Sequence, residues 1–131
     1  MARILIAEDS PDNAEILSEI MSDEGHQCLI AGNVADAIAI ATAELPALAF
    51  LDMQMPETVV TKSVVDDAGL QVARALKANP DTASISLVVV SGADPEALRA
   101  DALAAGAVAV ARKPYEFERL IELVEEYAGA Q

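Results

Sequence analysis

Apolar residues along the chain gather in five short runs, interrupted only by Ser86 in the fourth. The runs occupy residues 4–7, 28–31, 47–51, 85–90 and 107–111. None of them alternates with polar residues, and such continuity is typical of strands that are covered on both faces of a parallel sheet. We therefore expect five short strands in the core of the protein.

The segments between these runs have helical spacing, with recognisable start and stop signals. Ser10 and Pro11 suit the N-cap and the first position of one helix, and Gly25 suits its end. Further helices are expected at 33–45, at about 67–78, from Asp94 to just before Gly106, and after Pro114.

Strands and helices thus alternate five times, in the order (βα)5. Strands that alternate with helices form a parallel sheet with right-handed crossovers. The pattern predicts an α/β fold with an open, doubly wound, five-stranded sheet. We find no linker or internal repeat and expect one domain over residues 1–131, with no output domain.

The charge of the chain restricts its partners. The 22 acidic and 8 basic residues give a net charge of −14. This excess argues against direct binding of nucleic acid or an anionic membrane and favours divalent cations and basic protein surfaces. The single cysteine allows no internal disulfide, and acidic residues follow directly on the first apolar run, unlike a signal peptide. We expect a cytoplasmic protein.

Polar side chains come within two residues of the end of four of the five apolar runs. They are Glu8 and Asp9 after the first run, Asp52 after the third, Ser91 after the fourth and Lys113 after the fifth. Ligands of open α/β sheets bind at the carboxyl ends of the strands, so we expect these groups to converge there. Three carboxylates in a small site repel one another and need a cation, and oxygen ligands suit Mg²⁺.

A carboxylate beside a metal ion, a lysine and a hydroxyl is equipped for phosphoryl transfer. Asp52 would attack phosphorus to form an aspartyl phosphate, Lys113 would offset charge on the phosphoryl oxygens, and Ser91 would donate a hydrogen bond to one of them. Simpler interpretations remain open for each residue taken alone: a solvated strand-end acid, a surface lysine and a turn serine.

Four separated motifs, IAEDS, FLDMQMP, VVVSG and RKP, resemble the receiver domain of two-component response regulators over essentially the whole chain. The resemblance implies a stand-alone receiver domain with a flavodoxin-like strand order, 2-1-3-4-5. It implies Mg²⁺-dependent phosphorylation of Asp52 by a histidine kinase or a histidine phosphotransfer protein. It also implies a cis bond before Pro114 and a set of Mg²⁺ ligands: Glu8, Asp9, Asp52 and the backbone carbonyl of Gln54.

Two features depart from the family pattern. Val110 lies three residues before Lys113, where the family usually has an aromatic residue or histidine that moves inward on phosphorylation. The spacing from Asp52 to Gly69, 17 residues, is about twice that expected and places an extra loop at about 57–66. Its valine-rich sequence disfavours helix and permits an extended excursion. The loop could be a lid, a docking element or a segment without a task.

The sequence therefore predicts a phosphoacceptor signalling protein that catalyses only its own phosphorylation and dephosphorylation. It would act through phosphorylation-dependent binding to a downstream protein. One alternative is a degenerate receiver-like interaction module that keeps the fold without the chemistry. Another is a metal-dependent phosphatase on the same fold, which would need an acid where the chain has Gln54.

Overall fold

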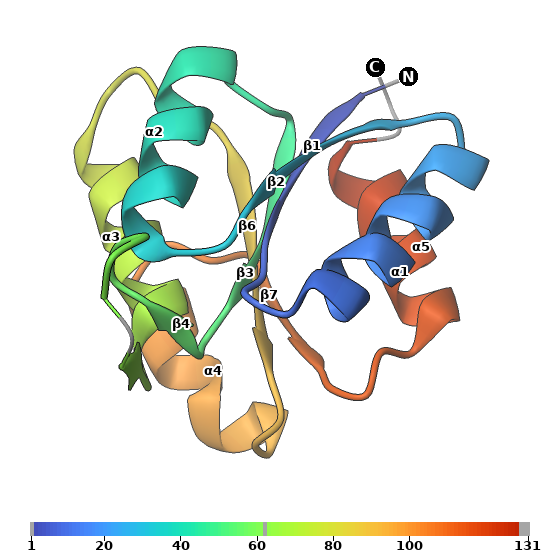
Figure 1. The fold of residues 1–131 in the computed structure, drawn as a ribbon. Coiled ribbons are helices and arrows are strands. Elements are labelled where there is room, and N and C mark those ends of the chain that lie inside the picture. The colour runs from blue at the N-terminus through green and yellow to red at the C-terminus, as the bar shows by residue number, and fades with distance from the viewer. Residues whose placement is uncertain (1, 62, 129–131) are drawn as a thin grey trace.

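A central parallel sheet with helices on both faces forms the protein (Figure 1), whose computed structural model describes residues 2–61 and 63–128. The strands of this sheet are β1 (Arg3–Ala7), β2 (Gln27–Ala31), β3 (Leu48–Asp52), β6 (Ser86–Ser91) and β7 (Ala109–Arg112). The helices are α1 (Pro11–Asp23), α2 (Val34–Glu44), α3 (Ala68–Ala78), α4 (Pro95–Ala104) and α5 (Phe117–Tyr127). The sheet order β2-β1-β3-β6-β7 confirms the predicted fold, since β6 and β7 are its fourth and fifth strands.

Two hydrophobic cores lie on opposite faces of the sheet. Helices α1 and α5 cover one face, and helices α2, α3 and α4 cover the other (Figure 1). Alternate residues of β1 divide between them: Ile4 and Ile6 pack towards α1 and α5, whereas Leu5 and Ala7 pack towards α2 and α3. Every residue of β3 is buried, which explains the unbroken apolar run before Asp52.

The edge strands are less covered than the sequence pattern predicts. Ile30 on β2 is 48% exposed, and β7 is only partly buried. Both strands have one neighbour in the sheet instead of two. The expectation of strands covered on both faces is therefore confirmed for β1, β3 and β6 and wrong for the two edges.

The residues predicted to begin and end the helices do so in the structure. Ser10, Asn33 and Asp94 each accept a hydrogen bond from a backbone N–H in the first turn of the helix that follows. Gly25 and Gly106 come shortly after α1 and α4, with φ angles of 87° and 99°. Only glycine adopts this left-handed conformation without strain, so it ends a helix cleanly. Within the described residues, no helix is long and apolar enough to span a membrane.

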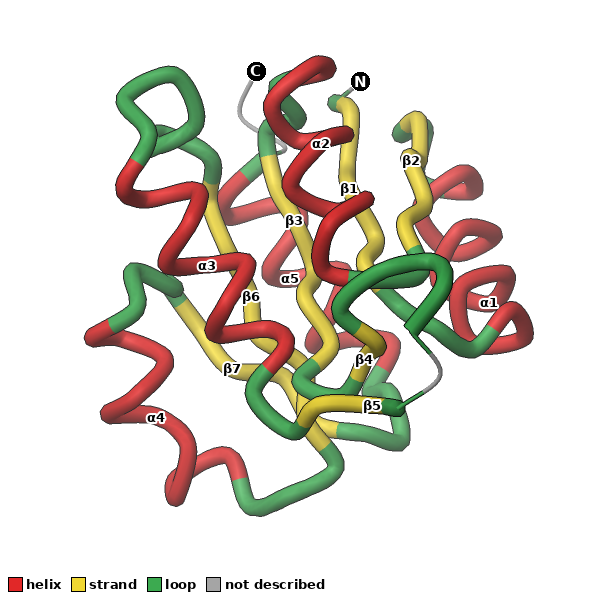
Figure 2. Tube along the Cα trace, turned by 60° about the vertical axis from the view of Figure 1, so that its left-hand side comes forward, coloured by secondary structure: helices red, strands yellow, loops and turns green. Residues whose placement is uncertain are grey.

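The extra loop forms a β-hairpin beside α2 (Figure 2). Its strands, β4 (Met55–Pro56) and β5 (Val64–Val65), pair antiparallel in a separate small sheet. The backbone N–H of Ala35 donates to the carbonyl oxygen of Glu57 at 2.9 Å, which ties the hairpin to the start of α2. Val59 and Val60 at its tip are 81% and 83% exposed. The segment therefore leaves the central sheet as a small separate hairpin.

Gly69 in the first turn of α3 packs tightly against the end of β3. A Cβ at this position would lie 3.0 Å from the carbonyl oxygens of both Leu51 and Asp52. We expect Gly69→Ala to lower the free energy of unfolding by about 1–3 kcal/mol, because rigid backbone must shift. Urea denaturation would measure this. Gly92→Ala is the control, since a Cβ there meets nothing within 4 Å; an equal loss in both variants would contradict the steric explanation.

Candidate functional site

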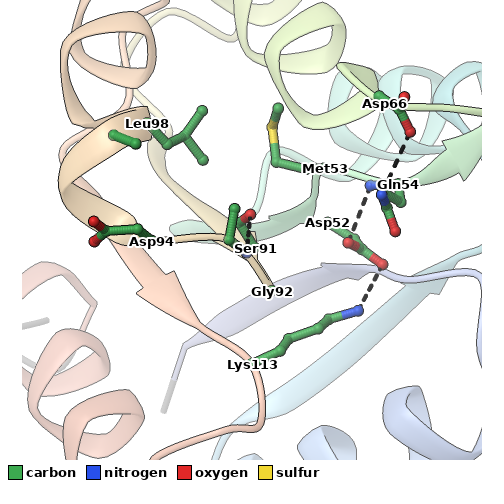
Figure 3. Close-up of a pocket in the computed structure, with 11 residues that line it drawn as sticks. Asp52, Met53, Gln54, Asp66, Ser91, Gly92, Asp94, Leu98 and Lys113 are labelled. Atoms are coloured by element: carbon green, nitrogen blue, oxygen red, sulfur yellow. Dashed lines mark hydrogen bonds and ion pairs between the residues drawn. The ribbon is translucent and has the colours of Figure 1, made fainter.

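The polar groups that follow the strands converge at the carboxyl end of the sheet, as predicted. The Nζ atom of Lys113 lies 2.9 Å from Oδ2 of Asp52 (Figure 3) and 3.1 and 3.2 Å from the two carboxylate oxygens of Glu8. Glu8 follows β1, Asp52 ends β3, and Lys113 follows β7. One ammonium group therefore bridges two carboxylates from different strands.

Asp52 is held in place by its own strand and by the loop after it. It is the last residue of β3 and pairs with Val90 of β6 in the sheet. Its Oδ1 atom accepts a hydrogen bond from the backbone N–H of Gln54 at 3.1 Å, while Oδ2 accepts from Lys113. The residue is only 4% exposed. Both carboxylate oxygens are thus fixed, and the side chain points into the site.

Three carboxylates form a compact group of possible metal ligands. One oxygen from each of Glu8, Asp9 and Asp52 lies within 4.8 Å of the other two. Glu8 and Asp52 are buried, whereas Asp9 is exposed, so the group opens to water on one side. Mg²⁺ prefers hard oxygen ligands and retains several waters, and these residues fit it. The carbonyl of Gln54 as a further ligand stays a prediction.

The electrostatics of the site reflect this crowding of acids. Burial, and then the hydrogen bond and negative charge of Asp52, raise the pKa of Glu8 to about 7. Burial alone would lower the pKa of Lys113, but its hydrogen bonds and charge interactions with Asp52 and Glu8 outweigh this and raise it. Burial and the same two acids also raise the pKa of Tyr115. The site therefore has more negative charge than Lys113 balances.

Lys113 is directed into the site by the chain around it. Its backbone N–H donates to the carbonyl oxygen of Ser91 at 2.8 Å, which continues the pairing of β6 and β7 beyond Arg112. The bond from Lys113 to Pro114 is cis, as the resemblance implied. Arg112 is exposed, so of the two adjacent cations only Lys113 reaches the carboxylates.

Ser91 ends β6 and is 7% exposed. Its Oγ atom accepts a hydrogen bond from the backbone N–H of Ala93 at 3.0 Å. A hydroxyl oxygen that accepts from the backbone still has its own hydrogen to donate. Ser91, Asp52 and Lys113 line the same cavity (Figure 3), whose volume is about 620 Å³. The hydroxyl is therefore positioned to donate to a group bound beside Asp52.

The cavity also has a residue that the sequence did not predict as part of the site. Asp66, at the end of the inserted segment, lies on its border, and its Oδ1 accepts a hydrogen bond from Nε2 of Gln54 at 3.4 Å (Figure 3). The hairpin tip, with Val59 and Val60, is not part of the described lining. Of the described residues in the segment, only Asp66 is among those that line the cavity.

Comparison with known proteins agrees with the arrangement of the site residues. The family model of the response regulator receiver domain matches residues 4–125. The protein PilH of Pseudomonas aeruginosa is 32% identical over 124 residues, which cover 95% of each chain. The polar-differentiation response regulator DivK of Brucella anthropi is 25% identical over 130 residues, or 96% of this chain and 95% of that protein.

A solved structure has the same fold over nearly the whole chain. The signal receiver domain of a signal transduction histidine kinase from Syntrophus aciditrophicus superposes with a TM-score of 0.82 at 28% identity. The match covers 99% of this chain and 92% of that one. The chain therefore belongs to the response regulator receiver domain family of two-component signalling.

Proposed function

We propose that this protein accepts a phosphoryl group on Asp52 in the cytoplasm and signals through a changed affinity for a downstream protein. The donor would be the phosphohistidine of a histidine kinase or of a histidine phosphotransfer protein. The observation that carries the proposal is the buried carboxylate of Asp52, 2.9 Å from Lys113 and open to a cavity. A relative named as a response regulator, matched over nearly its whole length, supports it.

The transfer is a nucleophilic displacement at phosphorus. An oxygen of Asp52 forms the new bond to phosphorus while the bond to the histidine nitrogen breaks and its electron pair stays on the imidazole. The product is an acyl phosphate on Asp52, and the imidazole takes a proton. The ammonium of Lys113 offsets negative charge on the phosphoryl oxygens, and the Ser91 hydroxyl donates to one of them.

Glu8, Asp9 and Asp52 would hold Mg²⁺, with the backbone carbonyl of Gln54 as a further ligand. When bound, Mg²⁺ would supply positive charge that offsets the carboxylates and the phosphoryl oxygens. The fit rests on the three carboxylate oxygens, which lie within 4.8 Å of one another. It also rests on the single ammonium group, that of Lys113, which Glu8 and Asp52 share and which Asp9 does not contact.

Stability without divalent cations should fall as the pH rises towards about 7. Glu8 titrates near 4.5 in an unfolded chain and near 7 in the folded protein, so between these values the folded state holds more protons. Stability then decreases with rising pH across this window and reaches its lower level above about pH 7. We expect the melting temperature in chelator to be ~3–10 °C lower at pH 8 than at pH 5.

Two comparisons isolate the contribution of Glu8. Glu8→Gln should remove most of this pH dependence, because the amide does not titrate. Added Mg²⁺ should raise the melting temperature more at pH 8 than at pH 5, since metal ligands must be deprotonated. A melting temperature in chelator that is constant over this range in the native protein would contradict the assignment.

Amide NMR spectra test the proposed function directly. We would record them with Mg²⁺ alone and then with added beryllofluoride, which mimics a phosphoryl group on a carboxylate. Shifts at Asp52, Ser91 and Lys113 that appear with beryllofluoride and vanish in Asp52→Asn would support a working phosphoacceptor. A response to Mg²⁺ without a response to beryllofluoride would contradict it.

The degenerate interaction module is the second candidate. Two observations favour it: Val110 occupies the place on β7 where the family usually has a ring, and Val59 and Val60 are exposed at the hairpin tip. The close association of Glu8, Asp52 and Lys113 argues against it. No NMR response to either Mg²⁺ or beryllofluoride would favour this module over the phosphoacceptor.

A further inference from the structure

Two acidic residues border the phosphoacceptor cavity and have no part in the proposed transfer. Asp66 ends the inserted segment, and Asp94 precedes α4. Both are exposed, and both contribute to the lining of the cavity that contains Asp52, Ser91 and Lys113. Figure 3 shows Asp66 and Asp94 on different sides of the cavity. A molecule in this cavity therefore meets two further carboxylates at its exposed border, which we call the entrance.

The positive charge that lines the cavity is already engaged in ion pairs with two carboxylates. Lys113 is the only basic residue in the described lining, and its Nζ binds Asp52 at 2.9 Å and Glu8 at 3.1 Å. Within the described part of the chain, no basic side chain lies within ion-pair distance of Asp66 or Asp94. Even with Mg²⁺ on the three ligand carboxylates, the entrance therefore keeps a negative charge, and the whole chain adds a net charge of −14.

We propose that Asp66 and Asp94 form an acidic rim that selects against small, doubly charged phosphodonors such as acetyl phosphate. This inference rests on the proposed function of Asp52. A free dianion gains little binding energy to offset Coulomb repulsion at the entrance, and the repulsion for a dianion is twice that for a monoanion. A protein-bound phosphohistidine offsets the same repulsion through contacts elsewhere on its surface. The inserted hairpin thus contributes to donor specificity by carrying Asp66 to the cavity.

The structure offers substitutions that remove charge and little else. In Asp66→Asn, the amide oxygen still accepts the hydrogen bond that Gln54 now donates at 3.4 Å. In Asp94→Asn, the side chain still caps α4, since asparagine is as good an N-cap as aspartate. Asp81→Asn is the matched control. It removes one charge in the turn after α3, beside Ser86 at the start of β6 and thus at the opposite end of the sheet.

The experiment compares two small donors with Mg²⁺ present. Acetyl phosphate is a dianion at neutral pH and phosphoramidate a monoanion, and intact-mass spectrometry follows phosphorylation by each. We expect Asp66→Asn and Asp94→Asn each to raise the second-order rate with acetyl phosphate about 2- to 5-fold at low ionic strength. The fold increase with phosphoramidate should be about the square root of that with acetyl phosphate, because the monoanion experiences half the repulsion. Both increases should shrink at ~0.5 M salt, and Asp81→Asn should change neither rate appreciably.

Each outcome tests either the acidic rim or the proposed phosphorylation of Asp52. Equal acceleration with both donors, acceleration that persists at high salt, or none at all would overturn the acidic rim. Failure of every variant to react with either donor while beryllofluoride still binds would also overturn it, because removal of the rim charges would then not open the site. Native-level phosphorylation of Asp52→Asn would instead overturn the proposed function.

Discussion

Replacement of Asp52 by asparagine is expected to abolish phosphoryl incorporation. The asparagine amide has no anionic oxygen to attack phosphorus, so no acyl phosphate can form. The substitution preserves shape, and the amide oxygen can still accept the hydrogen bond that the Gln54 N–H donates to Oδ1 at 3.1 Å. We therefore expect a folded protein whose mass does not change after incubation with phosphoramidate and Mg²⁺, whereas the native protein gains one phosphoryl group.

The chemistry of the product separates Asp52 from other acceptors. Hydroxylamine cleaves an acyl phosphate but leaves a phosphate ester intact, so the native product should be lost on treatment. Asp81→Asn, which changes the same residue type far from the cavity, should be phosphorylated like the native protein. Incorporation at the native level in Asp52→Asn would assign the phosphoryl group to another residue and would leave this carboxylate without its proposed role.

The fold could be read from the sequence because its central strands have an unusually simple pattern. A strand such as β3, covered on both faces, has no position for a polar residue until the strand ends at Asp52. Helix boundaries were equally visible, since Ser10 and Asn33 cap their helices through side chains that the sequence displays. The exposure of Ile30 could not be read, because the position of β2 at the edge depends on the order of all five strands.

Part of the candidate site followed from the same topology. Glu8, Asp52, Ser91 and Lys113 directly follow or end parallel strands, and the carboxyl ends of these strands share one edge of the sheet. Asp66 does not follow a strand of this sheet. Its position depends on the pairing of Met55 with Val65, and a segment rich in valine and threonine does not reveal this register.

The sequence also could not reveal which charged side chains pair with one another in the site. Lys113 was predicted to act on a phosphoryl group beside Asp52, but the structure shows that it binds Glu8 as well. This contact depends on the length of the lysine side chain and on the burial of both acids, whose side chains are 1% and 5% exposed. The bridge gives Lys113 a structural task in addition to its proposed catalytic one.

Because Lys113 has these two tasks, we expect Lys113→Met to lower both the stability of the protein and the rate of its phosphorylation. Without Mg²⁺, loss of the ammonium leaves two buried carboxylates with no counter-charge, and removal of one partner from a buried ion pair costs about 3–5 kcal/mol. Because the lysine side chain is itself 25% exposed, we expect the lower part of this range. The rate of phosphorylation by phosphoramidate should fall about 10²-fold or more, since charge on the phosphoryl oxygens would lack its preorganised cation.

Magnesium distinguishes the two tasks of Lys113. Added Mg²⁺ should restore much of the stability of Lys113→Met, because a cation among the carboxylates offsets the lost charge, but it should not restore the rate. Lys77→Met is the matched control: this lysine donates to the carbonyl oxygens of Ala83 and Ile85, so its loss should destabilise the protein equally with and without Mg²⁺. Native stability in chelator together with a native rate in Lys113→Met would make Lys113 an ordinary surface residue. A stability defect with an unchanged rate would limit it to bridging the two acids.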